Sequence, residues 1–217
     1  MRLRNIPGCR ETISKSKYMI QEEERSGKWS VYGKWDEVFG NNAPIYIEIG
    51  MGKGTFLMQQ ARLNPDINFV GIEKFSSVIL RAVQKQDEEE LANVRFLRME
   101  AEYLADVFSK NEVDRIYLNF SDPWPKEKHA KRRLTSRQFL ERYESFLRED
   151  GICEFKTDNT DLFDFSLEEC ASSGWRLISH TYDLYNSDMI EGNVQTEYEK
   201  KFVSLGQPIC KLVMMRP

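Results

Sequence analysis

The chain has 217 residues, of which 41% are hydrophobic, and a formal net charge of −4. This length suits one sizeable core and favours one domain over two. The cysteines, Cys9, Cys153, Cys170 and Cys210, form no CxxC pair and only two histidines accompany them, so we expect no metal site and no disulfide framework. No stretch approaches about 18 unbroken apolar residues, and the first residues lack an apolar leader. We therefore expect a cytoplasmic protein with no membrane partner.

Residues 1 to 40 are polar and show no sustained hydrophobic period. We expect a basic N-terminal arm over residues 1–40, partly disordered and with room for a short helix, and a single domain over residues 41–217. The first seventeen residues carry five Lys or Arg against one Glu, a local excess of +4. Such an island is typical of a phosphate-binding face, although a solubilising patch is equally consistent with the charge alone.

From Pro44 onward, the patterns of strands and helices alternate. Short apolar runs predict strands over residues 44–50, 68–74, 94–100 and 114–122, and helical spacing predicts helices over 55–64, 76–91 and 101–109. Ser76 and Ser77 are expected to cap the second of these helices.

The second half of the chain continues this alternation. A helix over residues 135–150, ending before Gly151, carries a core-facing stripe of Phe139, Leu140, Tyr143, Phe146 and Leu147, and a strand over 152–158 follows it. Segments 162–173 and 175–185, a helix opening at Thr196 and a strand over 209–215 complete the chain. The pattern predicts a doubly wound α/β fold with a mostly parallel sheet.

Carboxylates gather where the predicted strands end, which is where ligands of such a sheet bind. These strand ends are Glu48 to Gly54, Glu73, Glu100, Asn119 to Asp122, and Thr157 to Asp158.

The segment "EIGMGKG" places glycines at positions 50, 52 and 54. Alone it is compatible with a simple strand-to-helix turn, but its GxGxG spacing differs from the GxGxxG that binds a pyrophosphate. Glu48 would repel a pyrophosphate and attract a cation such as S-adenosylmethionine. Glu73, 19 residues after Gly54, is placed to accept hydrogen bonds from ribose hydroxyls. Glu100 lies near the expected adenine, so the ordered acids favour S-adenosylmethionine.

The segment "NFSDPWPKEKHAKRRL", residues 119–134, runs from an acid and two prolines into a basic stretch. From Lys126 to Arg137, six Lys or Arg accompany one Glu, and this run is expected to hold phosphates. The prolines restrict the backbone and should stiffen the loop that aims Asp122 and Lys126. We favour packing of Trp124 within the loop over stacking on a flipped base.

The motifs "EIGMGKG", "GIEK", "NFSDPWPK", "KRRL", "KTDN" and "TEYE" together resemble those of the bacterial tRNA (guanine-N(7)-)-methyltransferase family. The resemblance implies a seven-stranded, Rossmann-like class I methyltransferase fold. It also implies methyl transfer from S-adenosylmethionine to nitrogen 7 of a guanine in the tRNA variable loop, at position 46. The sequence departs from the family pattern at Glu127, where a basic residue is expected, at Lys128, where Arg is expected, and at Glu100, where the shorter Asp or Asn is expected.

The resemblance also assigns roles to residues. Asp122 is implied to be catalytic and to line the cofactor together with Glu48, Glu73 and Glu100, and we add Gly50, Gly52, Gly54 and Asn119 because they stand at the same strand ends. The implied substrate contacts are Lys126, Asp158, Thr196, Glu197, Tyr198 and Glu199. The implied RNA contacts are Lys128, His129, Lys131, Arg132 and Arg133.

Chemistry is consistent with this assignment, because guanine nitrogen 7 has a lone pair and no proton and its attack on the methyl group needs no general base. Asp122 could stabilise the cation that forms, while alignment of the reactants could supply roughly 7–11 kcal/mol. Thr196 and Glu199 also fit a capping box. The alternatives are a non-catalytic RNA-binding protein, disfavoured by Glu48, Glu73 and Asp122, and a methyltransferase for a small molecule or protein, disfavoured by the basic run. tRNA is the expected partner, and a homodimer is compatible with the sequence.

Overall fold

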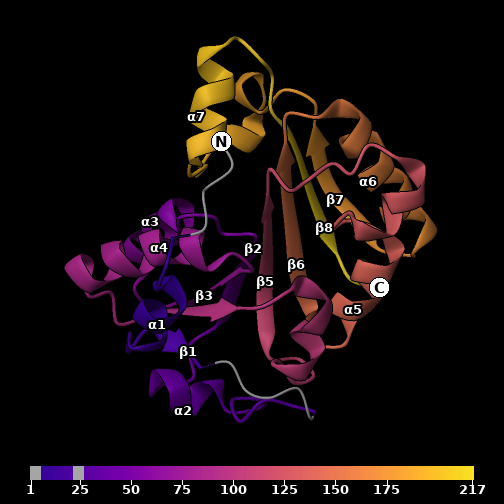
Figure 1. Cartoon of the computed structure of the whole chain (residues 1–217). Coiled ribbons are helices and arrows are strands. Elements are labelled where there is room, and N and C mark those ends of the chain that lie inside the picture. The colour runs from indigo at the N-terminus through magenta and orange to yellow at the C-terminus, as the bar shows by residue number, and fades with distance from the viewer. Residues whose placement is uncertain (1–5, 22–26) are drawn as a thin grey trace.

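The computed structural model describes residues 6–21 and 27–217, and one eight-stranded sheet forms their centre, in the order β1-β4-β3-β2-β5-β6-β8-β7 (Figure 1). The strands from β1 to β6 pair in parallel, and β8 is antiparallel to both of its neighbours. The predicted doubly wound α/β fold is confirmed, with one strand more than the seven expected. The strands are β1 Met19–Ile20, β2 Ile45–Ile49, β3 Asn68–Glu73, β4 Val94–Arg98, β5 Val113–Asn119, β6 Leu147–Thr157, β7 Arg176–Thr181 and β8 Cys210–Met215.

Helices cover both faces of the sheet. On one side α3 and α4 pack on β3, and α1 packs on α4; on the other, α5 and α6 pack on β6, and η1 packs on α5 (Figure 1). Each side has its own buried apolar cluster. The helices are α1 Cys9–Ser14, α2 Trp35–Phe39, α3 Thr55–Leu63, α4 Ser76–Glu89, α5 Arg137–Glu144, α6 Thr160–Ser172 and α7 Glu197–Ser204, and the 3₁₀ segments are η1 Ala101–Asp106, η2 Glu127–Arg132, η3 Leu184–Asn186 and η4 Asp188–Ile190.

The described part of residues 1–40 contains α1, β1 and α2, which is more than one short helix. Strand β1 extends the sheet beside β4 and accounts for the additional strand. Trp35 of α2 is fully buried, stacks on Phe108 at 5.0 Å between ring centroids and donates its indole N–H to the carbonyl of Val107 at 3.2 Å. Arg2 and Arg4, which contribute to the predicted basic excess, lie outside the described residues.

The chain between α5 and β6 differs from the predicted long helix. Helix α5 ends at Glu144, and β6 begins at Leu147 and contains Gly151. Phe146 and Leu147 are buried as expected, but they reach the core from a loop and a strand. Leu147 pairs with Val113 in the sheet, and a Cβ at Gly151 would approach the Leu147 side chain to 2.6 Å. Sheet pairing therefore ends the helix two turns early, and the glycine makes room for the bend.

Two helix predictions are also wrong in detail. Residues 101–106 form a 3₁₀ segment, shorter than the predicted helix over 101–109. Ser76 and Ser77 lie inside α4, whose N-cap residue is Phe75 with no side-chain cap. The carboxylate of Glu73 instead accepts the backbone N–H groups of Lys74 and Phe75, at 2.8 and 3.1 Å. Glu73, at the end of β3, thus satisfies the backbone N–H groups of the two residues that precede α4.

Candidate active site

The glycine-rich turn lies between β2 and α3, at the carboxyl end of the sheet. Gly50, Gly52 and Gly54 all have positive φ, at 79°, 58° and 71°, which side chains with a Cβ rarely adopt. The turn is tied to β3, because the N–H groups of Gly50 and Met51 both donate to the carbonyl of Ile72, at 2.8 and 3.0 Å. The turn therefore exposes backbone to a ligand while its base remains fixed.

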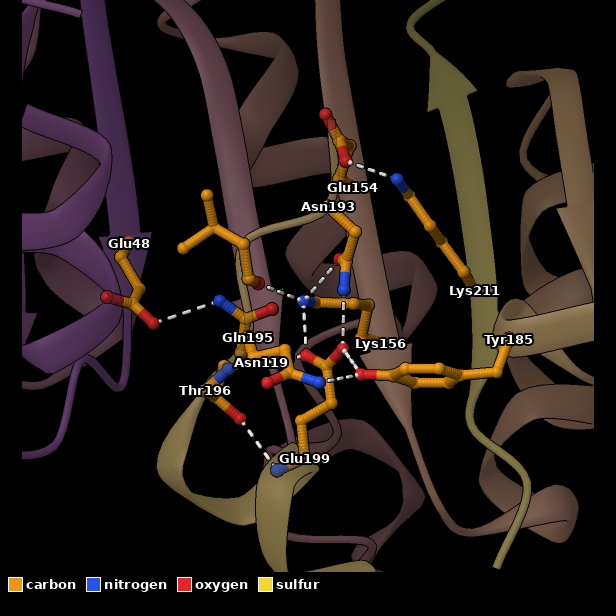
Figure 2. Close-up of polar contacts among 11 residues, drawn as sticks. Glu48, Asn119, Glu154, Lys156, Tyr185, Asn193, Gln195, Thr196, Glu199 and Lys211 are labelled. Carbon is orange, nitrogen blue, oxygen red and sulfur yellow. Dashed lines mark hydrogen bonds and ion pairs between the residues drawn. The ribbon is translucent and has the colours of Figure 1, made fainter. Parts of the chain in front are cut away.

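Glu48 is the most deeply buried of the three strand-end acids, with 2% of its surface exposed. Its Oε1 accepts a hydrogen bond from Nδ2 of Asn119 at 2.9 Å, as Figure 2 shows. Its buried Oε2 forms no hydrogen bond of acceptable geometry with the described residues. Burial raises the pKa of Glu48 to about 8, against opposing effects from the Asn119 hydrogen bond, the charge of Lys156 and the backbone of Leu57. A buried carboxylate oxygen without a donor is suited to the ammonium group of a ligand.

The two further strand-end acids are progressively more exposed. Glu73 is half-buried at the end of β3, and Glu100 is exposed just after β4. Burial raises the pKa of Glu73, although the nearby backbone N–H groups oppose this. Together with the glycine turn, Glu48 and Glu73 provide the donor and acceptor set that S-adenosylmethionine requires. The protein's own residues therefore fit this cofactor.

The chain changes its direction of winding between β2 and β5, which are neighbours in the sheet. Such a switch point is where ligands of α/β sheets bind. Asn119 ends β5, and the exposed Asp122 follows within the loop. Phe120 lies two residues before Asp122 and Trp124 two residues after it. Both have positive φ, at 51° and 42°, although neither is a glycine. Such conformations persist only where surrounding contacts enforce them, and they are typical of functional loops.

Contacts from the basic segment hold this loop. The guanidinium of Arg133 donates to the carbonyls of Pro123 and Trp124, at 3.0 and 3.2 Å, and lies 4.3 Å from the ring centroid of Phe165. The Trp124 ring contacts the edge of His129 and lies 4.9 Å from the guanidinium of Arg132. Trp124 thus packs within the loop, as we favoured from the sequence.

The predicted RNA contacts separate into two groups. Lys128, Lys131 and Arg132 are exposed on η2, whereas His129 and Arg133 are half-buried. Of the predicted substrate contacts nearby, Lys126 is exposed just before η2, and Asp158 is half-buried just after β6. The exposed cations are available to an external polyanion, while Arg133 is largely committed to the loop itself.

Helix α7 connects the C-terminal segment to the glycine turn. Its predicted capping box is confirmed: Thr196 Oγ1 accepts the N–H of Glu199 at 2.9 Å, and Glu199 accepts the N–H of Thr196 at 3.3 Å. Glu197 accepts Lys53 Nζ at 2.7 Å and Thr55 Oγ1 at 2.9 Å. The exposed Tyr198 ring stacks on Phe120, with centroids 6.3 Å apart. These contacts place the start of α7 beside both the turn and the Asp122 loop.

Lys156 belongs to this region, although the sequence analysis gave it no functional role. It lies in β6 and its Nζ bonds to Glu199, Asn193 and the carbonyl of Val194 (Figure 2). It also lines a cavity of about 330 Å³ with Asn119 and Asn193. The available signal was a lysine within the otherwise buried strand "ICEFKTD".

Among residues 6–21 and 27–217, no group of three His, Cys, Asp or Glu side chains could hold a metal ion. None of the helices in this described part is long and apolar enough to cross a membrane.

The strand order, with an acid-flanked glycine turn at the switch point, defines a class I methyltransferase fold. The structure is similar to that of the 16S rRNA methyltransferase KamB, with a TM-score of 0.66 and 16% identity, over 91% of this chain and 96% of that one. A family described as "Putative methyltransferase" matches residues 42–212.

Two relatives named tRNA (guanine-N(7)-)-methyltransferase match nearly the whole chain. The protein from Lachnoclostridium phytofermentans is 58% identical over 216 residues, which is 100% of this chain and 99% of the relative. The protein from Bacillus licheniformis is 48% identical over 212 residues, covering 98% and 97%. The chain therefore belongs to the tRNA (guanine-N(7)-)-methyltransferase family. The family and the fold class that the sequence motifs predicted are confirmed.

Proposed function

We propose that this protein methylates nitrogen 7 of a guanine in the tRNA variable loop, at position 46. The carrying observation is the position of Asp122, an exposed carboxylate in the loop that leads from Asn119, the partner of Glu48, to the exposed cations of η2. Two relatives of nearly the same length carry the name tRNA (guanine-N(7)-)-methyltransferase. An acid beside a cofactor pocket and a cationic surface is the combination that RNA methylation needs.

S-adenosylmethionine is the cofactor and, when bound, supplies an electrophilic methyl group. Glu48 binds its ammonium group through the oxygen that has no hydrogen-bond donor among the described residues. The backbone of Gly50, Gly52 and Gly54 approaches the ligand closely because these residues have no side chain. Glu73 accepts hydrogen bonds from ribose hydroxyls, and Glu100 borders the adenine. Asn119, at the end of β5, and Asp122, in the loop that follows, close the pocket.

Asp122 acts on the guanine without removing a proton, since nitrogen 7 attacks through its own lone pair. The carboxylate accepts hydrogen bonds from guanine N–H groups and stabilises the positive charge that develops on the purine. The strained backbone on either side of Asp122 fixes its direction before the substrate arrives. Lys126, Asp158 and residues Thr196 to Tyr198 surround the base and align it with the methyl group.

The exposed Lys128, Lys131 and Arg132 hold tRNA phosphates, with His129 and Arg133 supporting them from within the loop. The site residues all come from one chain, so the proposal applies to a monomer or a homodimer. A tRNA substrate places the reaction in the cytoplasm.

The test is methyl transfer from labelled S-adenosylmethionine to unmodified tRNA, with the product mapped by cleavage at 7-methylguanosine. We expect label at a variable-loop guanine with the wild type and loss of label with Asp122→Ala. Asp87→Ala is the control, because Asp87 is exposed on α4, and it should retain activity. Binding of the cofactor without labelling of any tRNA would contradict the proposal.

A further inference from the structure

Glu199 differs from its neighbours in the predicted substrate-binding segment because it is fully buried. Its Oε2 accepts Lys156 Nζ at 2.6 Å and the N–H of Thr196 at 3.3 Å. Its Oε1 accepts the hydroxyl of Tyr185 at 2.9 Å and Nδ2 of Asn193 at 2.6 Å. A carboxylate has about four acceptor positions, so these four donors occupy the group and leave no position for a substrate.

The ammonium group of Lys156, which pairs with this carboxylate, also has all of its hydrogen bonds satisfied. Only 4% of its surface is exposed, and the three donors of an ammonium group are satisfied. They bond to Glu199 Oε2, to Asn193 Oδ1 at 3.0 Å and to the carbonyl of Val194 at 2.9 Å. Figure 2 shows the Lys156 side chain directed from β6 toward Glu199. The pair therefore joins the sheet to the chain segment 193–199.

The two residues before Glu199 face outward. Glu197 makes its contacts at the glycine turn, with Lys53 and Thr55. Tyr198 is 56% exposed and rests on Phe120, two residues before Asp122. The buried pair thus anchors the short segment whose exposed side borders the cofactor turn and the catalytic loop.

We propose that Lys156 and Glu199 form a positioning pair, in which Glu199 binds the lysine rather than the guanine and thereby sets Glu197 and Tyr198 against the substrate. This role rests on the proposed tRNA methylation. It assigns Lys156 to the site and moves Glu199 from substrate contact to support.

The two roles for Glu199 predict different results for paired variants, namely Lys156→Met, Glu199→Gln and the double variant. Removing one member leaves a buried charge or its partner groups unsatisfied, so each single change should lower kcat/KM for tRNA about tenfold or more, mainly through KM. The double variant removes the charges together and should be several-fold more active than Lys156→Met. The Kd of the cofactor, measured without tRNA, should change much less because Glu48 and the glycine turn remain intact.

Losses that multiply in the double variant would overturn the proposal, since a direct guanine contact by Glu199 is independent of Lys156. A fall in thermal stability with unchanged KM and kcat would also overturn it, because the pair would then be only structural. Arg62→Met is the matched control. Arg62 forms an ion pair with Glu89 at 2.6 Å, outside the residues assigned to the site, and this change should leave the kinetic constants nearly unaltered.

Thermal unfolding of the wild type, Lys156→Met, Glu199→Gln and the double variant separates this inference from the proposed function. If the wild type labels no tRNA, the proposed function fails, yet the coupling between the two positions is still measured in Tm. A Tm for the double variant above that of Lys156→Met supports the anchoring pair, and additive shifts contradict it.

Discussion

The glycine turn with its acids and the basic segment of η2 flank the same end of the sheet, but their charges differ in exposure. Glu48 is 2% exposed and bonded to Asn119, whereas Lys128, Lys131 and Arg132 are exposed. A charge removed from water interacts strongly with one well-placed partner. Exposed charges are screened by water and salt, so each contributes little and the total attraction depends on how many there are. The first region is therefore suited to recognise one small cation, and the second to attract a polyanion.

The largest effect should come from Glu48→Gln, which removes the charge and keeps the shape of the side chain. Loss of a charged hydrogen bond worth about 1.5–3 kcal/mol should weaken S-adenosylmethionine binding roughly 10- to 100-fold. The stability of the free protein should stay equal or rise, because the folded state no longer holds an acid whose pKa is raised by burial and which opposes folding as pH rises. Calorimetric titration and thermal unfolding measure both quantities. An unchanged cofactor Kd would disprove the role of Glu48.

The affinity for the cofactor should depend on pH through the ionisation of Glu48. The pKa of Glu48 is raised to about 8, so the free protein is progressively destabilised by this group as pH rises from its ordinary pKa toward 8. A cationic ligand favours the ionised form. Cofactor affinity should therefore increase with pH up to about 8, by up to roughly tenfold per unit, with release of a proton. Titrations in buffers of different ionisation enthalpy measure this proton, and Glu48→Gln should abolish it.

Arg133 is the exception within the basic segment, because its guanidinium is bonded to loop carbonyls. Arg133→Gln should lower the free energy of unfolding by about 1–2 kcal/mol and reduce kcat, since the Asp122 loop loses support. The salt dependence of tRNA binding should change little. Arg142→Gln is the control, because Arg142 also donates to a carbonyl, but to that of Gln138 within its own helix α5. A large change in salt dependence with Arg133→Gln would identify it as a phosphate ligand instead.

The smallest effect should come from Lys128→Ala with Lys131→Ala. Each lost phosphate contact should reduce the log–log salt slope of tRNA binding by about 0.7–0.9 and weaken binding only a few-fold. Filter binding at several salt concentrations measures the slope, and cofactor affinity serves as the internal control. If the slope is unchanged, these lysines do not contact the RNA backbone.

The sequence by itself determined the features that depend on neighbouring residues. The alternation of apolar runs predicted the α/β sheet, the glycine spacing marked the turn after β2, and Thr-x-x-Glu marked the capping box of α7. These signals are local because backbone conformation, periodicity and capping depend on residues within a few positions. The acids at the strand ends were also found this way, since parallel strands bring their carboxyl ends to one edge.

Tertiary structure alone decided the features that depend on distant partners. The apolar stripe after Thr135 fits a helix, yet Leu147 pairs with Val113 and begins a strand. The short β1 has too few residues to form a pattern and exists because β4 has a free edge to accept it. The sequence predicts Glu199 only as part of the segment expected to contact substrate, and the fold alone shows its ion pair with Lys156, 43 residues away. Burial and charge pairing are set by packing across the fold, and hydrophobic periodicity cannot report them.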